Sequence, residues 1–283
     1  MTKNILITGA ASGIGLSAAV TLANEGLHVF AGVRKTEDLS ADALSHGNIT
    51  PIFLDVTDTE SIQTTVNTVN QQLGNVGLDG LINNAGIVVA GPLEWVPLSR
   101  LKTQLDVNVI GLVAVTQACL PMLRLAKGRI INIGSISGES ASPFIGPYTA
   151  SKHALEAISD ALRLELDAWG IRVSLIQPGS IDTPLWDKSL KDAEQDAKQL
   201  VPEIYSLYQA QMETVRQSAL KAKNRGIPPQ EVTEQIVHSL LSPRPKSRYV
   251  VGNDARFSKL LNLLPTGIKD TLIKMYLNLP KDL

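Results

Sequence analysis

The sequence has one cysteine, few aromatic residues and almost no net charge. Its single cysteine, Cys119, excludes an internal disulfide bond and a metal site built from several cysteines. Because Cys119 stands in an apolar helical pattern, we expect a buried structural thiol rather than a nucleophile. The 26 Lys and Arg nearly balance the 27 Asp and Glu. This balance argues against a general nucleic-acid-binding protein, which needs surplus cations to neutralise phosphates.

Long apolar runs and metal-binding clusters are also missing. No uninterrupted run reaches the roughly 18 apolar residues of a membrane-spanning helix. The apolar run 4–8 is far shorter than a signal-peptide core and leads directly into a glycine-rich turn. The four histidines are scattered, so we expect no metal site. These features predict a soluble, cytoplasmic protein.

Short β-rich apolar runs alternate with helical patterns along most of the chain. The expected strands are 4–8, 28–33, 49–54, 80–82, 129–133, 172–176 and 248–251. The expected helices are 14–25, 59–73, 99–126, 149–169 and 229–241. This alternation predicts an α/β fold: a single Rossmann-fold domain with a doubly wound, seven-stranded parallel sheet and helices on both faces.

Two regions depart from this alternation, and we expect helices in both. Residues 184–228, within a domain of residues 1–254, are interpreted as a substrate lid. Its apolar side chains either form a substrate wall or only pack the lid onto the domain, and they are Leu185, Trp186, Val201, Tyr205, Tyr208 and Met212. Residues 255–283 are expected to form a helical tail. From residue 243 onward, eight Lys and Arg stand against three acids. Such a tail is able to lie on an anionic membrane, but we expect it to pack on the same domain or across a subunit contact.

A glycine-rich turn follows the first expected strand and opens the first expected helix. Residues 8–15 read Thr-Gly-Ala-Ala-Ser-Gly-Ile-Gly. Glycines at such a place permit a tight turn and let the backbone approach a pyrophosphate at the helix N-terminus. The G-x-x-x-G-x-G spacing differs from the G-x-G-x-x-G of many dinucleotide folds. A loop without a ligand is the alternative, but the position between strand and helix favours nucleotide binding.

The end of the second expected strand bears on the choice of cofactor. An acidic residue there would accept from both ribose hydroxyls and repel a 2′-phosphate, whereas an arginine accommodates that phosphate. The strand ends without a carboxylate, and Arg34 and Lys35 follow at once. We therefore expect NADP(H) to be preferred, with NAD(H) as the alternative cofactor. A solvated basic turn is the other interpretation, and Ala11 has no side chain to help hold the phosphate.

Tyr148 and Lys152 form the candidate catalytic pair. Four residues apart on a helix, they share a face with Cβ atoms roughly 5–6 Å apart. A nearby ammonium favours phenolate, so we expect the pKa of Tyr148 to fall below its usual value of about 10. The phenol could then give and take a proton near neutral pH. The alternative is that Tyr148 and Lys152 lie on a solvent-exposed helix face without a catalytic role. Ser135 favours a site, because it ends a strand where open α/β sheets gather ligands.

Five motifs occur in one order along the chain: the turn 8–15, Asn83-Asn84-Ala85-Gly86, Ser135, Tyr148-x-x-x-Lys152 and Pro178-Gly179. On these motifs the sequence resembles the short-chain dehydrogenase/reductase family over almost its whole length. The long lid, Arg34 and the segment 248–255 are similar to the retinol and hydroxysteroid dehydrogenase branch of that family.

The resemblance implies roles for individual residues. Tyr148 would protonate a carbonyl oxygen, Ser135 would donate a hydrogen bond to it, and Lys152 would bind the nicotinamide ribose and tune Tyr148. Asn108 would order a water beside the lysine. Cofactor contacts are implied, together with Arg34, Tyr148 and Lys152, at Gly9, Ser12, Gly13, Ile14, Gly15, Asp55, Val56, Asn83, Ala85, Gly86, Pro178, Gly179, Ile181 and Thr183. Substrate contacts are expected at Ser135, Ser137, Tyr148, Leu185 and Trp186.

These inferences predict an oxidoreductase that transfers hydride between NADP(H) and a lipophilic ketone, aldehyde or secondary alcohol. Members of the family are usually homodimers or homotetramers, which we expect here too. One alternative is a 3-oxoacyl reductase of fatty-acid metabolism, against which the bulky lid and extended tail count. Another is a non-catalytic NADP-sensing regulator on the same fold. Such regulators typically lose the tyrosine or the lysine, and this chain keeps both.

Overall fold

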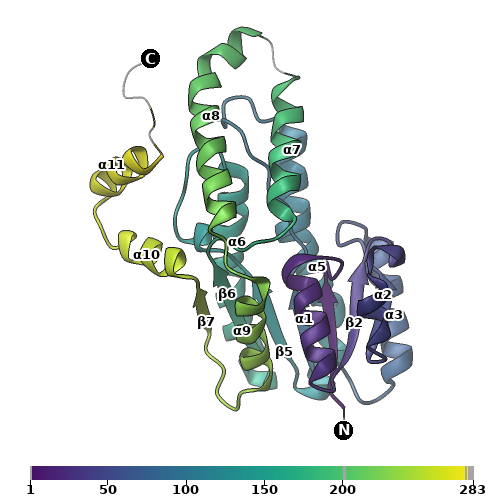
Figure 1. Ribbon diagram of the computed structural model, residues 1–283. Helices are drawn as coiled ribbons and strands as arrows, with labels where there is room; N and C mark the ends of the chain where they lie inside the picture. Colours follow the sequence, from purple (N-terminus) through teal and green to yellow (C-terminus); the bar gives the residue numbers. More distant parts are fainter. Residues whose placement is uncertain (1, 200–201, 278, 280–283) are drawn as a thin grey trace.

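A single parallel β-sheet of seven strands organises the chain. The computed structural model describes residues 2–199, 202–277 and 279 (Figure 1). The strand order is β3-β2-β1-β4-β5-β6-β7, and every neighbouring pair is parallel. The strands are β1 (Asn4–Thr8), β2 (His28–Val33), β3 (Ile49–Phe53), β4 (Gly80–Asn83), β5 (Arg129–Ile133), β6 (Arg172–Pro178) and β7 (Arg248–Val251). The predicted doubly wound sheet is confirmed.

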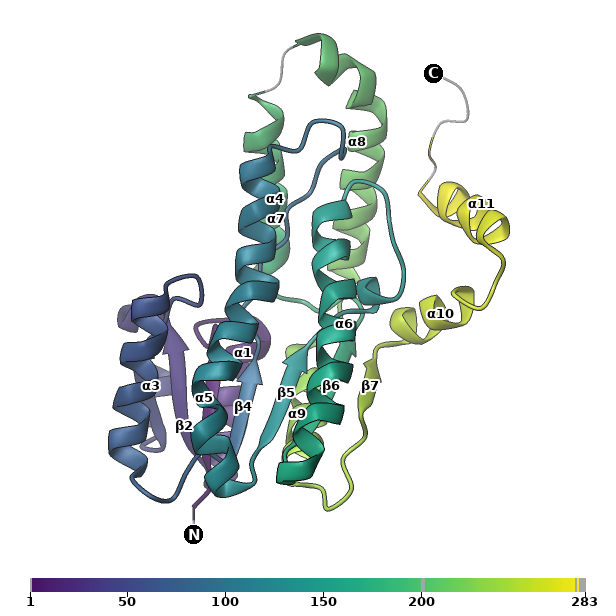
Figure 2. The same cartoon turned by 180° about the vertical axis from the view of Figure 1, so that it is seen from behind.

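Helices cover both faces of the sheet. In Figure 1, α1 (Gly13–Asn24) and α9 (Pro229–Leu241) lie in front of it, and the core on that side includes Val232, Ile236 and Leu240. These three residues are four apart, so one stripe of α9 faces the strands. The view from behind in Figure 2 shows the helices on the other face, α3 (Thr59–Leu73), α5 (Leu112–Ala126) and α6 (Gly146–Leu166).

The order of the strands places a ligand cleft at the carboxyl ends of the central strands. The chain moves outward from β1 to β2 and β3, then returns to β4 on the other side of β1. The loops after β1 and β4 consequently diverge at the carboxyl ends of these strands. In open α/β sheets this divergence leaves a crevice that receives ligands.

The helix predicted as uninterrupted over 99–126 contains a change of winding. It consists of α4 (Leu98–Leu105), a π-helical turn η2 (Asp106–Gly111) and α5. At Gly111 the helix packs closely against the main chain of Val56. A Cβ added at Gly111 would lie only 2.5 Å from the Val56 oxygen. Such π-helical turns are rare within α-helices and are often found at functional sites.

This long helix is also apolar. Within the described residues, Leu98–Ala126 is the one helix long and apolar enough to cross a membrane by length and composition alone. The sequence had given no uninterrupted apolar run of that length. The apolar character has a structural cause here, because Val115, Cys119, Met122 and Leu123 are buried against the sheet.

The two regions outside the alternation form helices, as expected. The lid region contains α7 (Leu185–Ala197) and α8 (Pro202–Asn224), which rise beyond the carboxyl ends of the strands (Figure 1). The tail contains α10 (Asn253–Leu261) and α11 (Thr266–Tyr276). The shorter helices are η1 (Thr36–Asp38), α2 (Ala41–Ser45), η3 (Ile136–Gly138) and η4 (Asp167–Trp169). The division into domain and tail stays a prediction.

Candidate active site

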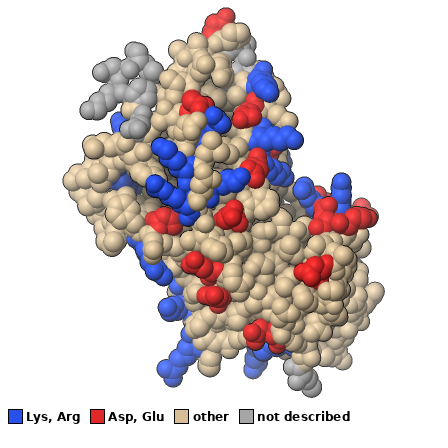
Figure 3. Space-filling model, in the orientation of Figure 1, with Lys and Arg blue, Asp and Glu red and all other residues tan. Residues whose placement is uncertain are grey.

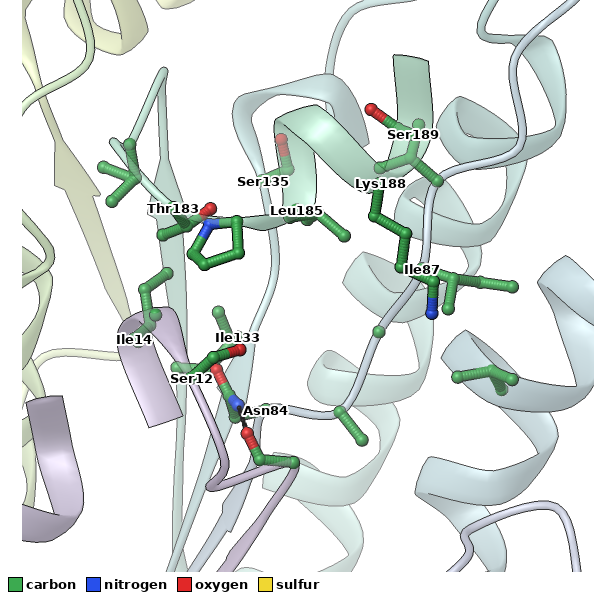
Figure 4. Close-up of a pocket in the computed structure, with 18 of the residues that line it drawn as sticks. Ser12, Ile14, Asn84, Ile87, Ile133, Ser135, Thr183, Leu185, Lys188 and Ser189 are labelled. Atoms are coloured by element: carbon green, nitrogen blue, oxygen red, sulfur yellow. Dashed lines mark hydrogen bonds between the residues drawn. The ribbon is translucent and has the colours of Figure 1, made fainter. Parts of the chain in front are cut away.

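A cleft of about 700 Å³ opens at the carboxyl ends of the strands. In Figure 4, Ser12 and Ile14 lie on one side of it, Ile87 and Lys188 on the other, and Ser135 between them. Most of the predicted site residues line this cleft: Gly9, Ser12, Gly13, Ile14, Arg34, Asp55, Val56, Ala85, Gly86, Ser135, Ser137, Tyr148, Lys152, Pro178, Gly179, Ile181, Thr183, Leu185 and Trp186. Residues from widely separated segments are thus brought to one place.

The glycine-rich turn forms a close-fitting cradle. Gly9 has a φ of +67°, and a Cβ there would lie 2.9 Å from the Cα of Ala85. Gly13, with a φ of +54°, would bring its Cβ within 3.0 Å of Thr183. Gly15 does not line the cleft. A Cβ at Gly15 would lie 2.3 Å from the Gly9 oxygen, so this glycine allows the turn to close on itself. The glycines therefore let the main chain at the α1 N-terminus border the cleft, which fits a pyrophosphate.

Arg34 and Asp38 stand at the end of the cleft beside β2. The Arg34 side chain is exposed and lines the cleft, where it is available to an anionic group. Asp38 of η1 also lines the cleft and was not among the predicted site residues, because it follows the strand by five positions. Asp55 accepts hydrogen bonds from the Thr57 amide at 2.9 Å and the Thr57 hydroxyl at 2.7 Å, which shape the turn after β3.

Ser135, Tyr148 and Lys152 meet in the cleft. Ser135 follows β5 and caps η3, where its Oγ accepts from the Ser137 amide at 3.1 Å. Its hydroxyl is close enough to the Tyr148 phenol to lower the pKa of that phenol. Lys152, one turn further along α6, donates from Nζ to the Ile133 oxygen at 2.8 Å. Its Nζ lies 5.7 Å from the centroid of the Tyr148 ring. The arrangement joins a buried hydroxyl, a half-buried phenol and a buried amine in one cluster.

The electrostatics of this cluster differ from expectation. Burial raises the pKa of Tyr148 above its usual value, and the nearby Ser135 hydroxyl offsets this only in part. Burial also lowers the pKa of Lys152 to about 8. The expected fall of the Tyr148 pKa is therefore wrong for this structure. Desolvation acts on both groups, and it disfavours the phenolate and the ammonium that would have stabilised it.

Two predicted site residues, Asn83 and Asn108, lie behind the cleft wall. The Asn83 amide donates to Thr116 Oγ1 and Asn132 Oδ1, both at 2.9 Å. Asn108, on the π-helical turn, accepts from the Ile87 amide at 2.9 Å. Its Nδ2 donates at 3.1 Å to the Ile87 oxygen and to Ser151 Oγ. Asn108 thereby ties the segment after β4 to the residue beside Lys152.

Several cleft residues were missed by sequence reasoning. Asn84 lines the cleft and donates from Nδ2 to the Thr8 oxygen at 3.0 Å and the Gly9 oxygen at 2.9 Å. Its place in the Asn83-Asn84-Ala85-Gly86 motif was the available signal. Lys188 of α7 extends toward Ile87 in Figure 4. Lys188 belongs to no recognisable motif. It is one of many charged residues in the lid, so its place in the sequence did not single it out.

The lid contributes fewer apolar walls than expected. Leu185 and Trp186 line the cleft, and Trp186 Nε1 donates to the Ile181 oxygen at 2.9 Å. Tyr205, Tyr208 and Met212 are not among the lining residues. Tyr208 instead donates a hydrogen bond to Glu94 and stacks edge-on against Phe144 with ring centroids 6.2 Å apart. Val201 lies outside the described residues.

A family model described as short chain dehydrogenase matches residues 3–194, which include the glycine-rich turn, Ser135, Tyr148 and Lys152. This chain belongs to the short chain dehydrogenase family. It is 37% identical to the 3-amino-tetrahydro-pyrrolizinone reductase of Xenorhabdus hominickii, over 90% of this chain and 88% of that protein. It is 33% identical to the NADPH-dependent 3-dehydrocapnine reductase of Ornithobacterium rhinotracheale, over 94% of each.

This short chain dehydrogenase is also similar to animal members of the predicted branch. Identity is 37% to retinol dehydrogenase 7 of Rattus norvegicus, over 96% of this chain and 87% of that protein. The resemblance to the retinol and hydroxysteroid dehydrogenase branch is thus confirmed. A solved short-chain dehydrogenase from Streptomyces avermitilis superposes with a TM-score of 0.80 at 26% identity, covering 96% of this chain and 95% of the other. A gluconate 5-dehydrogenase from Burkholderia cenocepacia, in complex with NADP and tartrate, gives 0.61 at 29% identity, covering 67% of this chain and 75% of the other.

Proposed function

We propose that this short chain dehydrogenase transfers a hydride between NADP(H) and a lipophilic ketone, aldehyde or secondary alcohol, with Tyr148 as general acid and base. The observation that carries the proposal is the convergence of Ser135, Tyr148 and Lys152 in the cleft that the glycine-rich turn also lines. A phenol that lines the same cleft as a hydroxyl and an amine is equipped to exchange a proton with the oxygen of a bound substrate.

The residues of the cleft suit a dinucleotide with a 2′-phosphate. Gly9 and Gly13 leave the α1 N-terminus open to a pyrophosphate, and Ile181 and Thr183 would meet the nicotinamide. Arg34 lines the β2 end of the cleft and would pair with the 2′-phosphate. Two similar proteins support the choice of NADP(H): a reductase named as NADPH-dependent and a dehydrogenase solved with NADP.

The chemistry divides between the cofactor and the chain. The nicotinamide, when bound, supplies or accepts the hydride. In the direction of reduction, Tyr148 Oη gives its proton to the substrate oxygen, and Ser135 Oγ donates a hydrogen bond to the same oxygen. The raised pKa of Tyr148 keeps the phenol protonated at neutral pH, which suits a proton donor. The charged form of Lys152 stabilises the phenolate left behind.

The walls near Tyr148 favour an apolar substrate. Ile87, Val88, Ile145 and Leu185 line the cleft together with Trp186. Trp186 uses its only donor on the Ile181 oxygen, so it presents an apolar ring surface. Such walls with a few polar groups bind apolar molecules and orient one reactive oxygen.

Turnover measurements test the proposal directly. The purified protein would be given NADPH or NADH with ketones and aldehydes of increasing apolar size, and consumption of the reduced nicotinamide followed by absorbance. We expect turnover with NADPH that rises with apolar size, and turnover at least about a hundredfold lower in a Tyr148→Phe variant. Turnover that is equal in the variant, or that strictly requires NADH, would contradict the proposed acid or the proposed cofactor, respectively.

A further inference from the structure

A lysine of the lid lines the cleft in which the proposed reaction takes place. Lys188 belongs to α7, and Figure 4 shows its side chain extending toward Ile87. Leu185, one helical turn earlier, lines the same cleft, so this face of α7 is turned to the cavity. Asp187 does not line the cleft and forms an ion pair with Lys223 of α8. The helix therefore presents Lys188 on the cleft side of the lid.

Contacts at both ends hold α7 in place over the cleft. At the start of the helix, Trp186 Nε1 donates to the Ile181 oxygen at 2.9 Å. Toward its end, Asp196 forms an ion pair with Arg100 of α4 at 2.9 Å. A side chain carried by an anchored helix is suited to recognise a ligand group at a defined position.

The ammonium of Lys188 has no acidic partner in the part of the chain that the structure describes. Asp192 lies four residues further along the helix, at a spacing that allows an ion pair, but it pairs with Arg100 at 3.6 Å. Asp187 pairs with Lys223. None of the ion pairs among the described residues includes Lys188. A cation whose neighbouring acids are engaged elsewhere is available to an anionic ligand.

Lys188 also differs from the other charged residues that line the cleft. These are Arg34, Asp38, Asp55, Lys152 and Asp254. Arg34 and Asp38 stand at the β2 end, and Lys152 donates to the Ile133 oxygen. The two remaining acids accept hydrogen bonds from main-chain amides. Lys188 is thus the charged group that stands beside the apolar walls of the cleft without a bond to another residue of the described chain.

The phosphates of a bound dinucleotide would lie away from Lys188. Ser12 and Ile14 belong to the α1 N-terminus, where the pyrophosphate is proposed to bind, and Figure 4 shows them on the other side of the cavity. Arg34, which is proposed to hold the 2′-phosphate, stands at the β2 end. The anion available to Lys188 is therefore one that the substrate carries.

Cations also gather on the outer surface of the lid, with some acids among them. In Figure 3, Lys and Arg side chains lie over the part of the molecule where Figure 1 places α7 and α8. The last turn of α8 contributes Lys221 and Lys223. Cationic side chains beside a cleft raise the local concentration of an anionic molecule that approaches it.

We propose that Lys188 binds a carboxylate or a similar anionic group of the substrate, so that the substrate has an apolar body and an acidic end. The inference rests on the proposed function and narrows its substrate class to lipophilic carbonyl compounds or alcohols that carry an acidic group. Ser135 and Tyr148 would hold the reacting oxygen, and Lys188 would hold the acidic end. The apolar walls between them strengthen the ion pair, because little water competes there.

Binding of matched ketones tests the pairing without requiring turnover. The protein saturated with NADP⁺ would be titrated by calorimetry with aliphatic ketones of increasing length that end in a carboxylate, and with the corresponding terminal amides. We expect wild type to bind the keto acid of best length about tenfold more tightly than its amide, because a hydrogen bond to a charged group is the stronger one. High salt should reduce this advantage, because it screens an exposed ion pair.

Substitutions at Lys188 assign the advantage to its charge. In Lys188→Gln the ratio of the two affinities should fall by about tenfold, and Lys188→Arg should recover most of it. In Lys188→Glu the amide should bind more tightly than the acid, because the charge is reversed. Lys191→Gln is the matched control and should keep the wild-type ratio, since Lys191 is exposed on the same helix but does not line the cleft. Circular dichroism reports the folding of each variant.

Three results would overturn the inference. They are keto acids that bind wild type no more tightly than their amides at any length, a wild-type ratio in Lys188→Gln, or a rise in the Kd for NADPH in Lys188→Gln as large as the loss for the acid. The last result would assign Lys188 to a phosphate of the cofactor. Failure of the proposed function differs from these. Preferential binding of the keto acid without reduction of either ketone by NADPH would support the pairing and contradict hydride transfer, whereas reduction of the amide with no advantage for the acid would do the reverse.

Discussion

Lys152 Nζ donates a hydrogen bond to the main-chain oxygen of Ile133 at 2.8 Å, which joins α6 to the end of β5. Ser135 stands two residues beyond Ile133, and its hydroxyl is close enough to the Tyr148 phenol to lower the pKa of that phenol. The strand and the helix are therefore held together by the same residues that carry the proposed chemistry. Distortion at either end of this connection should disturb the relative positions of hydroxyl, phenol and amine.

The first prediction concerns pH. Burial lowers the pKa of Lys152 to about 8, so its ammonium form is lost as pH rises through that value. If the ammonium stabilises the phenolate, kcat/KM for reduction should be level below this pH and fall above it, by about tenfold per pH unit. A Lys152→Arg variant keeps its charge, so its weaker activity should lack this decline. An identical decline in Lys152→Arg would assign the titration to another group.

A second prediction concerns the cofactor. Arg34→Ala should raise the Kd for NADPH by about tenfold or more and leave the Kd for NADH nearly unchanged, because only NADPH carries the 2′-phosphate. Adding Val33→Asp should shift the preference toward NADH. Lys35→Ala is the matched control, since Lys35 is exposed but is absent from the cleft lining. Fluorescence titration measures both constants, and equal losses for the two cofactors would contradict a phosphate contact at Arg34.

The sequence was sufficient for the features set by local pattern and spacing. Strand–helix alternation gave the sheet, and the spacing of Tyr148 and Lys152 placed both on one face of a helix. The close approach of Gly9 to Ala85 could not be predicted from local pattern or spacing. It depends on how β1 and β4 are aligned in the sheet. The resemblance supplied Gly9 and Ala85 as site residues, and the structure supplies the reason for the glycine.

The pKa of Tyr148 shows where sequence reasoning reached its limit. A lysine four residues away suggested a lowered pKa, but the sign depends on burial, which sequence spacing does not reveal. Tyr148 and Lys152 are both desolvated, which raises the pKa of the phenol and lowers the pKa of the amine. Asn108 is a similar case. The resemblance implied that it orders a water beside Lys152, which stays a prediction, and sequence spacing could not show that the π-helical turn directs its amide toward Ile87 and Ser151.

A third prediction follows for Asn108. Asn108→Ala would leave the Ile87 amide and oxygen and the Ser151 hydroxyl without their buried partner, so the free energy of unfolding should fall by about 2–3 kcal/mol. Asn108→Asp should recover part of this loss, because one carboxylate oxygen can still accept from the Ile87 amide. Urea denaturation monitored by fluorescence provides the comparison. Wild-type stability in Asn108→Ala, together with lost turnover, would instead favour a purely catalytic role.

The central claim is that the Tyr148 phenol transfers the proton. Tyr148→Phe removes only the hydroxyl, and the cleft wall around the ring remains. The most direct measurement is single-turnover hydride transfer from NADPH to a carbonyl compound, recorded with the Kd of NADPH for the same protein. We expect a loss of at least about a hundredfold in the transfer rate, with the Kd nearly unchanged. Transfer at the wild-type rate by Tyr148→Phe would contradict the account.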